Sequence, residues 1–131
     1  MVMGTKRIHK GKLVRDNIPQ IMRKQGLVVH EHVKDQNEFI LSLKEKLLEE
    51  ALEVKNTLSE SELIEELADV FEVLHALVKS NGLTLQQIEE ARIHKREIKG
   101  GFDARMYVES IEIDDNHPLI HRYIKPKTES N

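Results

Sequence analysis

The chain of 131 residues contains no cysteine and no tryptophan. Without cysteine, neither a disulfide framework nor a thiolate metal site can form. No stretch approaches the ~20 apolar residues that span a bilayer, and no apolar core follows the basic N-terminal segment, so neither a membrane anchor nor an export signal is expected. We therefore expect a cytoplasmic protein with no membrane partner.

Aromatic residues are also scarce, at 4% of the chain, while hydrophobic residues make up 39% and charged residues 33%. This balance is typical of amphipathic helices rather than aromatic-rich sheets. The formal charge of −3 gives no overall basic field to neutralise DNA or RNA, so a nucleic-acid partner is not expected. The length suits one domain, residues 1–131, and hence one principal site.

The spacing of apolar residues predicts four helices. A short one ends at Gly26, with Asp16 or Asn17 as its cap and Pro19 in its first turn. Longer helices are predicted over 37–55, from Ser59 or Ser61 to 80, and from Thr84 to the glycine pair 100–101. We predict an all-α helical bundle with short connections.

The C-terminal part gives a weaker signal. Residues 106–113 alternate apolar and polar side chains, which indicates either a short strand or an extended arm. Residues 125–131 are polar and basic, and we expect a frayed tail there.

Two pairs of acids interrupt the helical pattern. At 100° per residue, the apolar stripe of the helix over 61–80 centres near Leu63 and Leu74. Glu66 and Asp69 lie at one edge of this stripe, which we call its shoulder. The helix over 37–55 repeats the arrangement with a further i, i+3 pair, while Glu45 and Glu49 are predicted to face water. The shoulder acids of the two helices are Glu50, Glu53, Glu66 and Asp69.

In an antiparallel helix pair both shoulders fall on one side, so these four carboxylates can converge. Converging anions repel one another and lose hydration, which is costly unless a cation is present. A hard divalent ion with oxygen ligands suits such a site, so we expect Mg²⁺, with Mn²⁺ as a substitute. Retained waters and phosphate oxygens commonly complete such a shell, which points to phosphoryl or pyrophosphoryl chemistry. The opposing interpretation is that ExxE and ExxD spacings arise by chance in two acidic, solvated helices.

The segments 49–53 (EEALE) and 66–69 (ELAD) resemble the EExxE…ExxD pattern of the MazG-like all-α NTP pyrophosphohydrolases. Segments 12–19 (KLVRDNIP) and 99–102 (KGGF) resemble the flanks of the phosphoribosyl-ATP pyrophosphohydrolase-like branch of that superfamily. The resemblance covers roughly residues 12–107.

The resemblance implies hydrolysis of a nucleotide at its α-phosphorus, giving a nucleoside monophosphate and pyrophosphate, in a role such as nucleotide-pool house-cleaning. It makes Glu50, Glu53, Glu66 and Asp69 the metal ligands, with Glu49 beside Glu50 orienting the water. Two groups would bind substrate phosphates, and each has a structural alternative, as helix-end charges or a helix cap. These groups are Lys12, Arg15 and Asp16, and Lys95, Arg96 and Lys99.

Two other functions remain open on the sequence alone. One is a non-catalytic helical oligomerisation module, whose acidic side chains are only solvent-exposed surface charges. The other is a regulator that binds a nucleotide without hydrolysing it. A helical hairpin with acids on its shoulder offers only an open groove, so we also expect a second subunit to cover it, in a homodimer or a tetramer.

Overall fold

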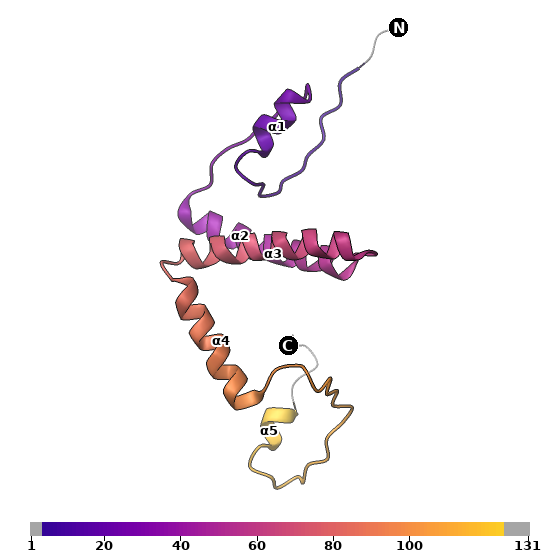
Figure 1. The fold of residues 1–131 in the computed structure, drawn as a ribbon, viewed down its shortest axis with the longest axis vertical. Helices are drawn as coiled ribbons and strands as arrows, with labels where there is room; N and C mark the ends of the chain where they lie inside the picture. The colour runs from indigo at the N-terminus through magenta and orange to yellow at the C-terminus, as the bar shows by residue number, and fades with distance from the viewer. Residues whose placement is uncertain (1–3, 125–131) are drawn as a thin grey trace. The chain divides into compact units, whose positions relative to one another are not determined.

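The computed structural model describes residues 4–124, which contain five helices and no strand (Figure 1). The prediction of an all-α fold is confirmed. The chain divides into two compact units between Ile93 and His94, within the fourth helix. The predicted single domain over 1–131 stays a prediction. The helices are α1 (Ile18–Lys24), α2 (Gln36–Lys55), α3 (Glu60–Ser80), α4 (Leu85–Lys99) and α5 (Ile120–Tyr123).

Helix α1 is short, as predicted, but it begins without the expected side-chain cap. Asn17 occupies the N-cap position, which is one of the two positions that the sequence predicts, but its side chain makes no capping hydrogen bond. Its own backbone is in the right-handed helical region, with φ −92° and ψ −3°, whereas a capping side chain normally acts from an extended residue. Pro19 lies in the first turn, and Gly26 follows the helix at a φ of 88°, which suits glycine.

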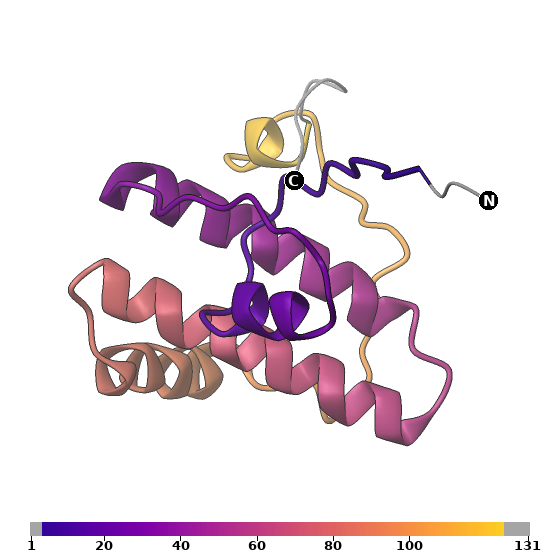
Figure 2. The same cartoon turned by 90° about the horizontal axis from the view of Figure 1, so that it is seen from above.

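Helices α2 and α3 form an antiparallel hairpin, joined by residues 56–59 (Figure 2). The Asp35 side chain caps α2 by accepting a hydrogen bond from the Glu38 amide at 2.9 Å. Ser59 caps α3 in the same way through the Glu62 amide at 3.1 Å, and the Glu62 carboxylate accepts from the Leu58 amide. The bonds from the Glu38 and Glu62 amides satisfy donors that the first turn of a helix leaves unpaired.

The core of the hairpin is small. Among the described residues the buried hydrophobic side chains are Leu43 and Val73, at 4% and 8% exposure, and the acid Glu50 is buried beside them at 9%. Helix α3 therefore meets α2 through the shoulder that carries Glu66, Asp69 and Val73. The centre of its apolar stripe, which the sequence marks as the main packing face, remains exposed.

Helix α4 begins at a complete capping box. The Thr84 hydroxyl accepts from the Gln87 amide at 3.2 Å, and the Gln87 side-chain oxygen accepts from the Thr84 amide at 2.8 Å. The helix ends at Lys99, and Gly100 follows at a φ of 84°, as the glycine pair predicts.

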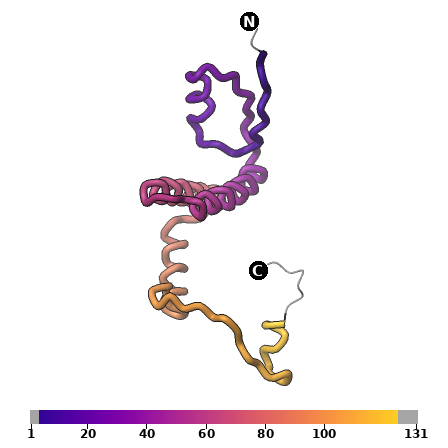
Figure 3. The backbone as a smooth tube through the Cα atoms, turned by 90° about the vertical axis from the view of Figure 1, so that its right-hand side faces the viewer, coloured from indigo at the N-terminus to yellow at the C-terminus, as the bar shows by residue number. Residues whose placement is uncertain are grey.

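The second unit continues from α4 through irregular backbone to α5, which the sequence did not predict (Figure 3). No strand occurs within residues 94–124, so the strand alternative for residues 106–113 is wrong. This segment has no regular secondary structure, and the extended-arm alternative stays a prediction. The predicted tail over 125–131 lies outside the described residues.

The hairpin core generates a direct test of stability. We expect Leu43→Ala to lower the free energy of unfolding by roughly 2–4 kcal/mol, because truncating a buried leucine loses its transfer free energy and leaves a cavity. The same change at Leu58, which is 93% exposed, is the matched control and should alter stability by less than about 0.5 kcal/mol. Chemical denaturation followed by circular dichroism measures both. Equal losses at the two positions would contradict the assigned core.

Candidate metal site

Three of the four predicted acids come together between α2 and α3. One carboxylate oxygen from each of Glu50, Glu66 and Asp69 lies within 4.8 Å of the other two. Glu66 and Asp69 share a face of α3 because they are three residues apart, and Glu50 reaches them from the antiparallel helix α2. Glu50 is buried and the other two are half-buried. The arrangement offers several oxygen donors to one small volume.

Glu53, the fourth predicted acid, is exposed and stands outside this group of three. It still influences the group electrostatically, since it is one of the charges that act on the Glu66 carboxyl. The i, i+3 relation of Glu50 and Glu53 on α2 explains this, because Glu53 lies one turn further along the same side of the helix.

The close approach of the carboxylates shifts the pKa of Glu66. Loss of hydration raises the pKa of Glu66, and the neighbouring charges of Asp69, Glu50 and Glu53 raise it further. A hydrogen bond shared with Glu50 acts in the same direction. The surrounding protein therefore makes the Glu66 carboxyl harder to ionise than a free glutamate, and a cation placed among the carboxylates would oppose that effect.

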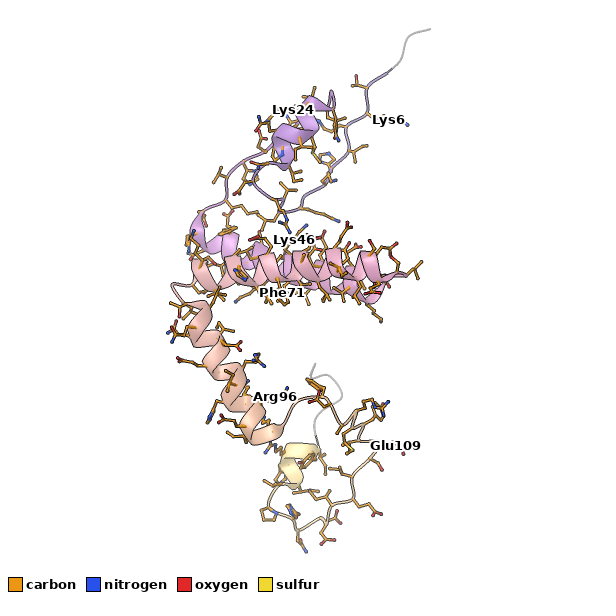
Figure 4. The ribbon with its side chains drawn as sticks, viewed as in Figure 1. Lys6, Lys24, Lys46, Phe71, Arg96 and Glu109 are labelled. Carbon is orange, nitrogen blue, oxygen red and sulfur yellow. The ribbon has the colours of Figure 1, made fainter. Side chains whose placement is uncertain are left out.

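Two lysines offset the charge on the α2 side of the group. The Lys46 ammonium lies 3.2 Å from the Glu49 carboxylate and 3.6 Å from that of Glu50, and Lys12 reaches Glu49 at 3.4 Å. The prediction that Glu49 faces water is therefore wrong, since its side chain is only 31% exposed. Figure 4 labels Lys46 on the hairpin, with its side chain drawn.

These lysines also fix the ionisation of Glu49. Partial burial raises the pKa of the Glu49 carboxyl, but hydrogen bonds and charge attraction from Lys46 and Lys12 outweigh it and hold that pKa below its usual value. The pKa of the Glu49 carboxyl is thus lowered, whereas that of the Glu66 carboxyl is raised. Carboxyls whose pKa values are moved by burial and specific charge partners are a recurring feature of functional sites.

An arginine from the N-terminal segment contacts the α3 side. Arg15 donates to the Asp69 carboxylate at 2.6 Å and also lies 3.9 Å from Glu72. The N-terminal segment thus brings two of the predicted phosphate-binding residues, Lys12 and Arg15, to the acids. Asp16, the third, is exposed.

The remaining predicted phosphate-binding residues, Lys95, Arg96 and Lys99, belong to the second unit and are exposed. Arg96 donates to Asp103 at 3.1 Å. Its guanidinium also lies against Gly101, where an added Cβ would clash with an Arg96 nitrogen. The second glycine of the pair therefore leaves room for Arg96 to fold back.

The sequence analysis did not identify Lys46, whose ammonium forms ion pairs with both Glu49 and Glu50. The spacing along the chain could have predicted these pairs, since residues three and four apart are neighbours on a helix surface. A lysine at 46 followed by acids at 49 and 50 predicts these ion pairs. The contact of Arg15 with Asp69 spans 54 residues and has no such local signal.

The chain matches no family model, and no curated protein or solved structure proves similar to it. The described helices include none with both the length and the apolar character that crossing a bilayer requires.

The raised pKa of Glu66 predicts how stability depends on pH. The folded protein binds the Glu66 proton more tightly than the unfolded chain, so this group costs stability as pH rises through the raised pKa. Without divalent metal, we expect Glu66→Gln to melt at a higher temperature than the wild type at pH 7. The two should converge near pH 4, where the glutamate is largely protonated in both states.

Glu65→Gln is the matched control, because it removes the same charge from the preceding residue of α3, which is exposed. Thermal melts of the three proteins between pH 4 and pH 8 make the comparison. An equal gain from Glu65→Gln would attribute the effect to net charge and would contradict crowding at Glu66.

Proposed function

We propose that this protein is a Mg²⁺-dependent nucleotide pyrophosphohydrolase of the MazG-like, phosphoribosyl-ATP pyrophosphohydrolase-like kind. It would hydrolyse a nucleoside triphosphate or related nucleotide at the α-phosphorus. One observation carries the proposal, namely the convergence of Glu50, Glu66 and Asp69 within 4.8 Å at a half-buried helix contact. The sequence resemblance supplies the reaction, and nucleotide-pool house-cleaning is the role it would fit.

The donor set suits a hard cation. All the donors are carboxylate oxygens, which Mg²⁺ and Mn²⁺ prefer, and histidine or cysteine ligands that would favour softer metals are absent from the group. Glu50, Glu66 and Asp69 would bind the ion, with Glu53 completing the set from its exposed position. A bound divalent ion would supply charge neutralisation for phosphate oxygens and lower the pKa of a water ligand.

The protein's own side chains would position the reactants. Glu49 is ionised and can accept a hydrogen bond from a water beside Glu50, which orients that water for attack. Lys12 and Arg15 already lie at the acids and carry the charge that phosphate oxygens need. Asp16 belongs to the N-terminal segment that would fold over the substrate phosphates. The resemblance also assigns Lys95, Arg96 and Lys99 to phosphate binding.

We further propose that the protein acts in the cytoplasm as a homodimer or tetramer. The exposed stripe of α3 supports this, since a hairpin with so small a core leaves much apolar surface to be covered. The same stripe favours a second candidate function, a non-catalytic helical oligomerisation module. Release of pyrophosphate that depends on metal distinguishes the two, and a nucleotide-binding regulator would bind without release.

The metal assignment predicts a response of stability to Mg²⁺. An ion that binds only the folded state stabilises it by RT ln(1 + [L]/Kd), so the melting temperature should rise with Mg²⁺ concentration. Asp69→Asn should melt at least as high as the wild type without Mg²⁺ and should lose most of the response. The control Glu65→Gln should keep it. If saturating Mg²⁺ and Mn²⁺ left the melting temperature of the wild type unchanged, the result would contradict the proposed metal site.

The same residues should control catalysis. A panel of nucleoside triphosphates with pyrophosphate detection would identify a substrate, and on it we expect Glu53→Gln and Asp69→Asn to lose at least about 100-fold in kcat/KM, because removing metal ligands removes transition-state stabilisation. Glu65→Gln should retain wild-type activity. Turnover at the wild-type rate by Asp69→Asn would exclude the proposed ligand set.

The position of attack is tested with ¹⁸O-labelled water. Attack at the α-phosphorus should place the label in the nucleoside monophosphate and leave the pyrophosphate unlabelled, as mass spectrometry would report. Label in orthophosphate would instead mean attack at the terminal phosphorus. That result would refute the reaction even if the carboxylates bound the metal as proposed.

A further inference from the structure

Helix α3 carries an uncovered apolar seam with the spacing of a coiled coil. Its members are separated by three, four, three and four residues, the alternation that places side chains along one side of a helix for pairing. The first four members are exposed at 62%, 41%, 63% and 39%, and the last is half-buried. The seam consists of Ile64, Leu67, Phe71, Leu74 and Val78.

This seam is separate from the acid site. Glu66, Asp69 and Val73 face α2, whereas Ile64, Leu67 and Phe71 line a shallow apolar depression with Ala68 on another side of α3. At 100° per residue, the centre of the seam stands more than a quarter turn around the helix from the acids. A partner on the seam would leave the carboxylates open.

The composition of the seam suits a second copy of itself. The positions that flank a coiled-coil seam are here occupied by Leu63, Ala68, Val70, His75 and Leu77, so no carboxylate, lysine or arginine flanks it between residues 63 and 78. Two copies can therefore meet without like charges being brought together. A seam of 15 residues is about 21 Å long, enough for four turns of contact.

The charged residues at the two ends of α3 favour one relative orientation of two paired α3 helices. Glu60 and Glu62 lie at the N-terminal end of α3, and Lys79 lies at the C-terminal end. A parallel pair would set acid against acid and lysine against lysine. An antiparallel pair centred on Phe71 would bring the acidic end of each helix to the lysine end of the other, which also opposes the two helix dipoles favourably.

We propose that two copies of this chain pair antiparallel through the α3 seam, with the two Phe71 side chains at the two-fold axis. The pairing is isologous, so Ile64 of each copy lies opposite Val78 of the other. It specifies the interface of the proposed homo-oligomer and does not depend on the metal site or on catalysis.

The absence of native cysteine gives a clean test of this register in the full-length chain. Under mild oxidation, Phe71→Cys should form a disulfide-linked dimer in high yield, since its two copies meet at the axis. Ile64→Cys should not link to itself, whereas the double variant Ile64→Cys with Val78→Cys should. Glu72→Cys, on the neighbouring exposed position, is the control and should stay unlinked. Non-reducing gels and mass spectrometry identify the linked residues.

Oligomeric state in solution provides the second measurement. We expect the wild type to sediment as a dimer or a larger even oligomer, and Phe71→Glu to raise the dissociation constant roughly 100-fold, because pairing would bury a charge. Phe102→Glu makes the same change at a phenylalanine that is 97% exposed, and should leave the oligomer intact. Circular dichroism confirms that each variant stays helical.

Each contrary result overturns the pairing. If the wild type is monomeric, or if the dimer persists in Phe71→Glu, the seam is not an interface between two copies of the chain. Self-linking by Ile64→Cys would mean a parallel pair, and capture of the seam by residues 94–124 of the same chain would appear as a monomer. If pyrophosphate release continues in any of these cases, the proposed function stands and only the interface fails.

Discussion

The contact between α2 and α3 is the interaction on which the described structure most depends, and it contains like charges. Glu50, Glu66 and Asp69 meet there because the buried pair Leu43 and Val73 holds the helices together. Apolar burial thus stabilises a contact that electrostatic repulsion opposes, as the raised pKa of Glu66 records. A cation bound among these acids would relieve the repulsion, which is why the proposed metal site is placed there.

In this structure the positive charge comes from the chain itself. Lys46 is a local neighbour on α2, whereas Lys12 and Arg15 come from a segment far away in sequence. These contacts are half-exposed, so each stabilises the fold only modestly. Their consequence is positional, because they bring the N-terminal segment to the acids. The same cations would then be close to any anionic ligand that arrived with a metal ion.

Local signals explain how much the sequence could predict. Helices α2, α3 and α4 follow from apolar periodicity and from caps such as Ser59 and Thr84, which act within three residues. The angular positions of Glu66 and Asp69 along the helix also predicted that the two acids lie on the same face of α3, as they do. The partial burial of Glu49 was not predicted because it depends in part on Lys12, which is distant in sequence. Helix α5 was not predicted because four residues give no periodicity. Substrate identity has no local signal at all.

Helix α3 carries its acids and its most apolar side chains on different sides, and this division has a mechanical consequence for the proposed site. Its acids face α2, while its most apolar side, around Phe71, faces away. A rotation of α3 about its own axis would separate Glu66 from Glu50. A second apolar contact on the opposite side would restrict that rotation. Covering the seam would therefore preserve the spacing of the carboxylates without touching them, and this links assembly to the geometry of the site.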